Sequence, residues 1–360
     1  MGGKVGLKGT DGQEIVKKAM ELGATPVSLV RATEALQMIA PIKDEIELIA
    51  YPFEMGEDEA RNCGFDPIII GAITRGETTA TDTNNAAREM LKLRVELILF
   101  AGGDGTARDI YEAIGQEVPA LGIPAGVKIH SGVFAVNPRK AGELALRFLK
   151  GSAKLREAEV MDIDEEAFRR GRVSARLYGY LRVPYERSLV QSVKSGSFAV
   201  LDDKRNQEII AEYVAEKMED DWYYVLGPGT TVKAITDKLG IKKTLLGVDL
   251  INKGKIVAMD LNEEQLLRYI EGKKVKIIVS PIGGQGFIFG RGNQQISPEV
   301  IRKVGKGNIL VIATVSKLSS MGLGQPLLVD TGDDCVDKMM SGYVRVITGY
   351  NEEVVVKVAG

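Results

Sequence analysis

The sequence predicts an α/β protein with parallel strands, and two observations carry this prediction. Short apolar runs recur through the first 150 residues, and segments with the spacing of amphipathic helices separate them. Strands that are buried on both faces and alternate with helices are typical of a parallel sheet covered by helices. The pattern stops at a stretch of short alternating segments and then resumes, which predicts a small β-rich domain and a second α/β unit.

The first α/β domain is expected to span residues 1–150. Its apolar runs predict strands with the sequences EIELIAY at 45–51, DPIIIGAI at 66–73, VELILFAGG at 95–103 and PALGIP at 119–124. Its helices are expected to start at residues with capping chemistry, namely Thr10 with Gln13, Asp82, and Asn137 with Pro138. Gly23 and Gly151 should end the first and the last of these helices, and the middle one should run through Met90.

The β-rich domain is expected to combine two distant parts of the chain. Short alternating segments at 173–183 and 197–203 predict an antiparallel β region. The tail at 343–359 alternates as a strand pair around the turn YNEE, and we expect it to return to this β region. Residues 151–205 and 342–360 would then form one domain, with residues 206–341 inserted in it as the second α/β unit.

Charge and composition narrow the classes of partner. Lys and Arg number 47 and Asp and Glu 49, whereas nucleic-acid binding usually needs a clearly basic face, so we expect no nucleic-acid partner. No apolar run approaches the roughly 20 residues of a transmembrane helix, and the N-terminus lacks an apolar signal core, so we expect a cytoplasmic protein without a membrane partner. Cys63 and Cys335 are too few for a disulfide framework, and His130 is the only histidine, which excludes a His-rich zinc site.

The segment FAGGDGTARD at 100–109 follows the third predicted strand and carries the strongest chemical signal. Ligands of open parallel sheets bind beyond the carboxyl ends of the strands. Gly102, Gly103 and Gly105 let the backbone approach a ligand, and the N–H groups of the next helix favour phosphate. Asp104 in this setting could hold Mg²⁺ or accept a proton from an attacking hydroxyl. The alternative is that Asp104 or Thr106 only caps the helix.

The loop PAGVKIHSG at 124–132 follows the next predicted strand and should lie beside the GGDGT segment. Gly126 gives its backbone freedom, and Lys128, His130 and Ser131 could reach phosphate oxygens. The alternative is a glycine-punctuated loop with a solvent-facing lysine and a hydrogen-bonded histidine. His130 is a second candidate for a catalytic base, although Asp104 is the better one.

Other positions leave a functional and a structural interpretation open. Asp82 and Thr83 either bind ligand or only begin a helix. The N-terminal residues Gly2, Gly3, Lys8 and Thr10 form either a phosphate-approach loop or a frayed terminus. The segments GPGTT at 227–231 and SPIGGQGFIFGRGNQQ at 280–295 form either a second wall of the cleft or a separate effector site. Arg291 in the second segment could pair with phosphate through both arms of its guanidinium group. Asp333 and Asp334 are either Mg²⁺ ligands or a solvated turn or helix cap.

The segment VELILFAGGDGTARDI resembles the GGDGT signature of the NAD kinase and diacylglycerol kinase superfamily. Further segments resemble one archaeal and bacterial branch, the predicted ATP- or polyphosphate-dependent NAD kinases; they are GGKVGLKGTDG at 2–12, TDTNNAA at 81–87, PAGVKIHSGVFAVNP at 124–138, YVLGPGTT at 224–231 and the segment at 280–295. The order of these segments extends the resemblance over nearly the whole chain.

The resemblance implies an NAD kinase-like fold and the transfer of a phosphoryl group to the 2′-hydroxyl of the adenosine ribose of NAD, giving NADP. ATP or polyphosphate would be the donor, with Mg²⁺ as cofactor, and the protein would be a homo-oligomer. In this family the motif aspartate contacts NAD and is the usual candidate base, a role that falls here on Asp104.

Two departures from the family pattern bear on these expectations. Typical NAD kinases hold the nicotinamide end and the adenine with an Asn-Glu pair, and the matching region at 182–196 has none, which keeps a lipid or small-polyol kinase and a non-catalytic nucleotide sensor open. Similar proteins also begin with a strand that ends in Asn-Pro-x-Ala-Gly. Gly2 and Gly3 stand just past that point, so either the start is assigned too late or this strand is absent from the sheet.

Overall fold

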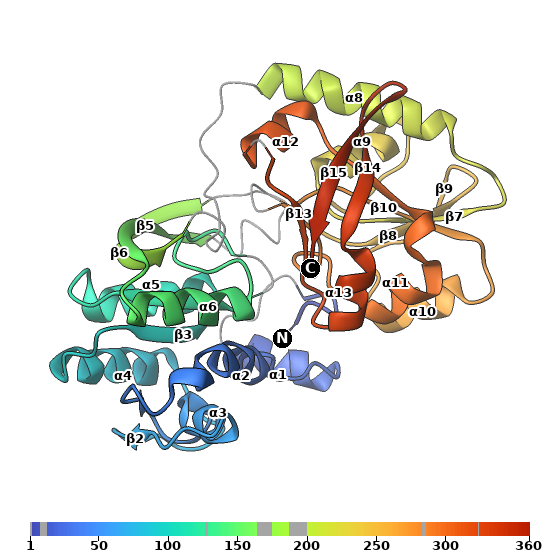
Figure 1. Ribbon diagram of the computed structural model, residues 1–360. Helices are drawn as coiled ribbons and strands as arrows, with labels where there is room; N and C mark the ends of the chain where they lie inside the picture. The colour runs from blue at the N-terminus through green and yellow to red at the C-terminus, as the bar shows by residue number, and fades with distance from the viewer. Residues whose placement is uncertain are drawn as a thin grey trace. The chain divides into compact units, whose positions relative to one another are not determined.

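The computed structural model describes residues 2–7, 13–126, 129–163, 175–186, 200–282, 286–322 and 324–360 of the 360-residue chain (Figure 1). This part of the chain divides into two compact units, one formed by residues 25–193 and the other by residues 2–24 and 194–360. Both units pack helices on parallel strands, so the predicted α/β class is confirmed.

The first unit contains the following elements in chain order: α2 (Ser28–Ile39), η1 (Ala40–Ile42), β1 (Ile49–Ala50), η2 (Phe53–Met55), α3 (Glu57–Asn62), β2 (Ile68–Ile69), α4 (Ala80–Lys92), β3 (Ile98–Gly102), α5 (Asp104–Ile114), β4 (Ala120–Pro124), α6 (Pro138–Leu149), β5 (Lys154–Ile163) and β6 (Ala175–Tyr185). The second unit contains α1 (Gln13–Glu21), α8 (Val200–Glu216), β7 (Tyr223–Leu226), α9 (Thr230–Lys238), β8 (Asp249–Asn252), β9 (Lys255–Ala258), α10 (Glu263–Ile270), β10 (Val275–Val279), β11 (Phe287–Phe289), α11 (Pro298–Val304), η3 (Lys306–Asn308), β12 (Ile309–Ile312), α12 (Val315–Ser320), β13 (Leu327–Val329), α13 (Asp334–Met340), β14 (Gly342–Gly349) and β15 (Glu352–Ala359).

The first unit is built around the parallel pair β3–β4, which is in register from Ile98 with Ala120 to Gly102 with Pro124. Successive side chains of a strand point to opposite faces, and both faces are apolar here. Helices α2 and α6 pack on one face, and α4 and α5 pack on the other. Strands β1 and β2 also pair in parallel, as a separate two-stranded sheet.

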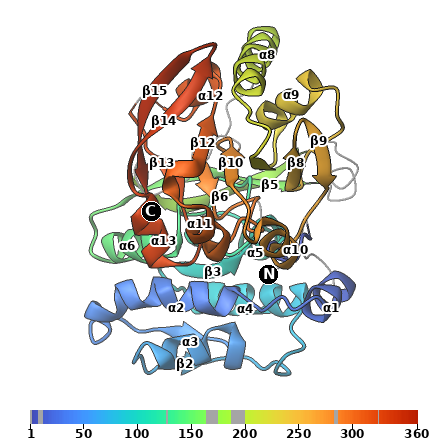
Figure 2. The same cartoon turned by 90° about the vertical axis from the view of Figure 1, so that its right-hand side faces the viewer.

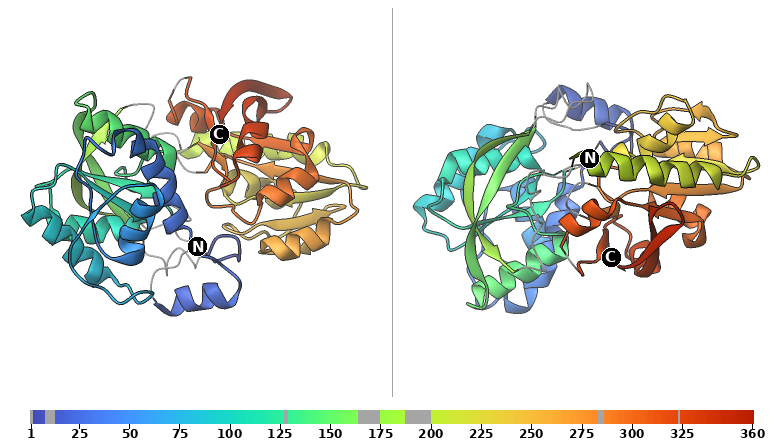
Figure 3. Two further views of the ribbon diagram at one scale, coloured as in Figure 1. Left: turned by 60° about the horizontal axis from the view of Figure 1, so that its bottom comes forward. Right: turned by 90° about the horizontal axis from the view of Figure 1, so that it is seen from above.

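The predicted antiparallel β region is present and belongs to the first unit. Strands β5 and β6 pair from Lys154 with Tyr185 to Ile163 with Ala175, and Figure 3 shows them as a long curved ribbon. Their apolar side chains join the core cluster of α5, so the ribbon is fixed to the parallel pair rather than to the tail of the chain.

The second unit contains a nine-stranded sheet in the order β11-β13-β15-β14-β12-β10-β7-β8-β9. The neighbours β14, β12, β10 and β7 run in parallel, whereas β8 is antiparallel to β7 and β9 is antiparallel to β8. Helices α8 and α9 cover one face through one apolar cluster, and α10, α11 and α13 cover the other face through a second cluster (Figure 2). The parallel strands are therefore buried on both sides.

The predicted return of the tail to the 151–205 region is wrong. Strands β14 and β15 form the expected hairpin, but β14 pairs with β12 and β15 pairs with β13 inside the large sheet. The physical reason is that β14 is buried from Val346 to Gly349, so its apolar residues need the two helix layers that the large sheet supplies. The units of the structure thus differ from the predicted parts 1–150, 151–205 with 342–360, and 206–341.

One local expectation also needs correction. The segment 197–203 is predicted to be a strand, but α8 already begins at Val200, and residues 197–199 lie outside the described residues. Thr10 and Lys8 lie outside them too, so the cap of α1 is not described. Gly2 and Gly3 belong to the second unit, where Gly3 lies against the Gln294 side chain.

In the described ranges, no helix is at once long enough and apolar enough to cross a bilayer.

The contact between α2 and α6 generates a test of the first unit. A methyl group added at Gly142 of α6 would lie 2.1 Å from the backbone oxygen of Ala35 in α2. Alanine is favoured over glycine in a helix by about 1 kcal/mol, but this clash with rigid backbone should dominate. We expect Gly142→Ala to lower the free energy of unfolding by about 1–3 kcal/mol in urea titrations. Gly307→Ala, where an added methyl group meets nothing within 4 Å, should stay within about 0.5 kcal/mol of the wild type; equal effects of the two changes would contradict the α2–α6 packing.

Candidate functional site

The GGDGT segment forms the turn from β3 into α5. Strand β3 ends at Gly102, α5 begins at Asp104, and the N-cap residue is Gly103. No side chain caps this helix, so neither Asp104 nor Thr106 has the capping role that was the structural alternative. Gly105 is the second residue of α5, and the first N–H groups of a helix have no partner within it.

The Asp104 carboxylate accepts hydrogen bonds from the loop that follows β4. Its Oδ2 accepts the N–H of His130 at 2.8 Å, and its Oδ1 accepts the N–H of Ser131 at 2.9 Å. The Nδ1 atom of the His130 ring lies 3.3 Å from Oδ2. The Asp104 side chain is only 9 % exposed. The aspartate thus joins two loops that are 26 residues apart in the sequence.

Glycines allow these two loops to approach closely. The carbonyl oxygen of Gly102 accepts N–H groups from both Ala125 and Gly126, at 2.9 and 3.1 Å. A methyl group added at Gly126 would lie 3.1 Å from the Cα of Gly103, and one added at Gly102 would lie 2.3 Å from the Thr106 hydroxyl oxygen. The expected proximity of the loops is confirmed. A side chain at Gly126 would crowd the other loop, and one at Gly102 would crowd the first turn of α5.

Ser131 needs a correction, because its hydroxyl is already used inside the protein. The hydroxyl donates to the carbonyl oxygen of Met161 in β5 at 3.0 Å and accepts the N–H of Met161 at 2.9 Å. The residue is 1 % exposed. Ser131 therefore anchors the loop to β5 instead of reaching a phosphate through its side chain, and sequence reasoning did not identify Met161 as its partner.

Two further residues of this loop, His130 and Lys128, were also predicted to contact phosphate. The His130 side chain is 23 % exposed, so its ring reaches the surface of the site while its backbone is held by Asp104. Lys128 lies outside the described residues. Its part in phosphate binding remains a prediction.

Asp82 has a structural task in the first turn of α4. The helix begins at Ala80 with Thr79 as N-cap, so the predicted cap at Asp82 is wrong by three residues. The Asp82 carboxylate accepts the N–H and the hydroxyl of Thr79, both at 2.8 Å, which completes a capping box.

The charge of Asp82 also affects a neighbouring tyrosine. Burial and a hydrogen bond with Glu89 raise the pKa of Tyr51 to about 12, and the nearby charge of Asp82 adds to the rise. Thr83 follows Asp82 in the same helix, and ligand binding by it stays a prediction.

The GPGTT segment connects β7 to α9 in the second unit. Gly229 is the N-cap of α9 and has a φ of 109°, a conformation that glycine adopts without strain. Its N–H donates to the carbonyl oxygen of Leu245, and the N–H of Gly227 donates to Ile278 in β10. The segment therefore repeats the strand–glycine–helix design of the first unit.

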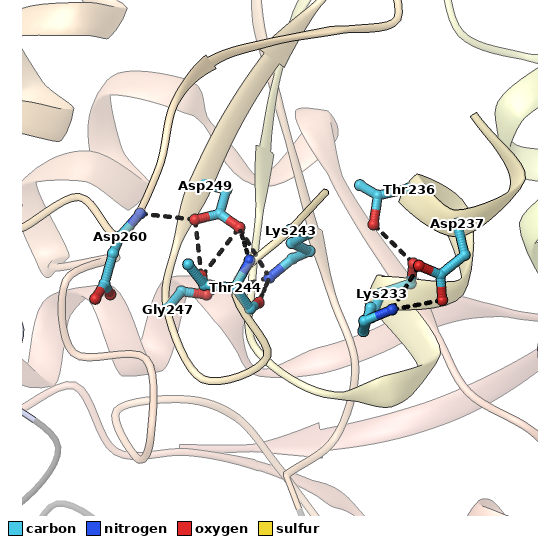
Figure 4. Close-up of polar contacts among 8 residues, drawn as sticks. All are labelled: Lys233, Thr236, Asp237, Lys243, Thr244, Gly247, Asp249 and Asp260. Atoms are coloured by element: carbon cyan, nitrogen blue, oxygen red, sulfur yellow. Dashed lines mark hydrogen bonds and ion pairs between the residues drawn. The ribbon is translucent and has the colours of Figure 1, made fainter. Parts of the chain in front are cut away.

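A buried ion pair that sequence reasoning missed supports this segment (Figure 4). Lys243 Nζ lies 3.6 Å from Asp249 Oδ2, and both side chains are fully buried. Lys243 also donates to the carbonyl oxygens of Thr244 and Gly247, and Asp249 accepts the N–H of Thr244 at 2.7 Å and that of Asp260 at 2.7 Å. These bonds fix the loop that contains Leu245, whose carbonyl oxygen accepts the N–H of Gly229. The sequence signal that could have identified this pair is Asp249, a charged residue inside the apolar run TLLGVDLI.

The remaining charged candidates have partners within the second unit. Arg291 is 3 % exposed, stacks on the Phe287 ring at 4.3 Å and has its Nε 3.9 Å from Asp330, so the expected pairing with phosphate is replaced by a buried arrangement. Asp333 is the N-cap of α13, and its hydrogen bond with Arg302 lowers its pKa. Of the two interpretations given for Asp333, Mg²⁺ ligand or helix cap, the structure therefore supports the helix cap. Over the described ranges, no group of three or more His, Cys, Asp or Glu side chains is suited to a metal ion.

Comparison with known families decides the class of this protein. Residues 23–153 match the family model of the ATP-NAD kinase N-terminal domain, and residues 219–358 match that of the ATP-NAD kinase C-terminal domain. The chain belongs to the NAD kinase family. It is accordingly an NAD kinase-like phosphotransferase, with Asp104 in the N-terminal kinase domain and GPGTT in the C-terminal one. Comparison with the curated proteins and with the solved structures gives no significant match.

The two ion pairs of Figure 4 generate a matched test of the C-terminal domain. Removing one partner of a buried pair leaves the other charge uncompensated, so Asp249→Asn should lower the free energy of unfolding by about 3–5 kcal/mol. Lys233→Met breaks the exposed pair with Asp237 and should cost about 0–1 kcal/mol. Urea unfolding followed by the fluorescence of Trp222, the only tryptophan, reports on this domain. Equal losses in both variants would contradict a supporting role for the buried pair.

Proposed function

We propose that this chain transfers a phosphoryl group from ATP or polyphosphate to the 2′-hydroxyl of the adenosine ribose of NAD, giving NADP. The proposal is supported most directly by Asp104, whose carboxylate stands where β3 turns into α5 and is held by the second glycine loop. Membership of the NAD kinase family supports the reaction class and the acceptor. The donor is left open between ATP and polyphosphate.

Phosphate binding is proposed for the backbone around Asp104. The N–H groups at the start of α5 and the positive end of its dipole favour an anion. Gly102, Gly103, Gly105 and Gly126 carry no side chain that would keep a phosphate away from the backbone. Phosphoryl transfer needs positioning and electrostatic stabilisation more than covalent chemistry from the protein. In this arrangement Asp104 takes the proton of the attacking hydroxyl or orients that hydroxyl.

Mg²⁺ is proposed to enter with the phosphoryl donor. Mg²⁺ in such sites is usually bound by one or two carboxylates together with substrate phosphates and water, and it neutralises phosphate charge. The Asp104 oxygens already accept backbone N–H groups, and the described residues offer no cluster of three acidic or histidine ligands. We therefore propose that the phosphates of the donor supply most of the Mg²⁺ ligands.

We further propose that the protein is a cytoplasmic homo-oligomer that works without nucleic acid or a membrane. The nearly balanced charge supports the part of this proposal that concerns nucleic acid, because nucleic-acid binding usually needs a basic face. The region of the missing Asn-Glu pair lies largely outside the described residues, so it adds no observation in favour of another acceptor.

The test is NADP formation from NAD and Mg²⁺ with either ATP or polyphosphate. The wild type should form NADP, and Asp104→Asn should lower kcat/KM by about 10²–10⁴-fold, the usual contribution of general acid–base catalysis. Asp66→Asn, at a fully exposed carboxylate of the same unit, is the matched control and should keep the wild-type rate.

An Asp104→Asn variant that works at the wild-type rate would remove Asp104 from the chemistry. A wild type that forms no NADP with either donor would remove NAD as acceptor. Transfer from radiolabelled ATP to a lipid or a small polyol would then identify another kinase activity, and tight NAD binding without turnover would identify a nucleotide sensor.

A further inference from the structure

Strand β15 of the second unit has a free edge along most of its length. On one side it pairs with β14 from Glu352 to Val358, but on the other side β13 reaches it only at Val358 and Ala359. Pro326 stands just before β13 and has no N–H group for a ladder, so β13 does not extend further along this edge. Among the described residues, no strand pairs with the outer side of residues 352–357. Unpaired N–H and C=O groups on such an edge are a template for another strand.

The side chains beside this edge are apolar and exposed. Val355 is 67 % exposed and Val354 is 39 % exposed. In the hairpin, which Figure 1 shows as a long ribbon, Val355 stands opposite Arg345 and Lys357 stands opposite Tyr343. Tyr343 is itself 70 % exposed. Because β-branched and aromatic residues favour pleated, half-buried surfaces, this composition favours the addition of a further strand.

The charges along the edge are opposite in sign and symmetric about Val355. Glu353 lies two residues before it, and Lys357 lies two residues after it. Edges that avoid pairing carry charges that repel an incoming strand. An antiparallel copy of this strand would instead bring its Lys357 to Glu353, and opposite charges that face each other across a ladder stabilise it. The free edge is therefore complementary to itself.

The geometry of antiparallel pairing selects one register. Only every second residue directs its N–H and C=O groups to a given edge, so a two-fold axis between two copies must pass a residue that faces its own copy. With the axis at Val355, Glu353 faces Lys357 of the second copy, and the symmetry makes this contact twice. With the axis one residue earlier or later, neither charged residue faces one of opposite sign.

The ends of this overlap agree with the neighbouring elements. The overlap covers residues 353–357, and β13 begins to pair at Val358. At that point the strand of the second copy reaches Glu352, its first residue, and turns back to its own β14 through Asn351. The second copy thus leaves the edge where β13 takes it over.

We propose that two copies of this chain associate through the free edges of β15, antiparallel and with the two-fold axis at Val355. This inference rests on the homo-oligomer of the proposed function and assigns its interface. Glu353 of each copy pairs with Lys357 of the other, and the two Val355 side chains meet at the axis. The hairpins of both copies then form one continuous sheet. An interface of this kind is isologous, as in the common two-fold dimers.

Charge reversal tests the interface. The overlap is short, so we expect a weak dimer that sedimentation equilibrium detects over a concentration series. Glu353→Lys and Lys357→Glu each place like charges across both contacts, and each should raise the dimer Kd at least about tenfold. The double variant Glu353→Lys with Lys357→Glu restores opposite charges and should return the Kd to within about threefold of the wild type.

A second pair of variants and a measurement on the wild type keep the test independent of any one substitution. Val355→Arg places two like charges at the axis and should also raise the Kd. Val257→Arg changes another exposed valine, in β9 at one end of the same sheet, and should leave the Kd unchanged. In the wild type, amide hydrogen exchange over residues 353–357 should slow as the protein concentration rises, because pairing protects the N–H groups of the edge. Urea unfolding shows whether each variant is folded.

The outcomes separate this inference from the proposed reaction. A wild type that stays monomeric at every concentration overturns the inference. A dimer whose Kd ignores the charge reversals, or whose amides at 353–357 exchange as fast as in the monomer, uses another surface and overturns it as well. None of these measurements needs turnover. If the wild type forms NADP but does not dimerise through β15, the inference fails and phosphoryl transfer stands; if it dimerises as described but forms no NADP with either donor, the proposed reaction fails and the inference stands.

Discussion

The carboxylate of Asp104 connects the two loops on which the site of the first unit depends. It accepts the N–H groups of His130 and Ser131 from one loop, and the Nδ1 atom of the His130 ring lies 3.3 Å from it. Buried carboxylates need such partners, because a buried charge without hydrogen bonds costs several kcal/mol. The two backbones meet where Gly126 of one loop packs against Gly103 of the other and donates its N–H to the carbonyl oxygen of Gly102.

The second unit stabilises its strand-to-helix turn by a different interaction. Its GPGTT turn also links a strand to a helix, but a buried lysine–aspartate pair in a neighbouring loop holds it instead of a carboxylate within the turn. The aspartate of the first unit touches the partly exposed ring of His130, whereas Asp249 is fully enclosed. Buried pairs of the second kind fix a structure without meeting a ligand, and this difference explains why the chemistry is assigned to the first unit.

Several expectations failed where a residue found a partner that is distant in the sequence. Ser131 was expected to face phosphate but is bound to Met161, and Arg291 was expected to face phosphate but is enclosed by Phe287 and Asp330. The tail was assigned to the wrong sheet for a related reason. Alternation along a strand shows which side chains share a face, but it does not identify the neighbouring strand.

The sequence by itself determined the α/β class, the ends of β3 and β4, and the turn into α5, because glycines, caps and hydrophobic periodicity act over a few residues. It also identified Asp104 and His130 as candidates from their place after buried strands. Only the tertiary structure decided that the two residues touch, that Asp82 closes a capping box and that Asp249 pairs with Lys243. Such partners depend on how strands and loops come together in space, and local sequence patterns carry no information about that distance.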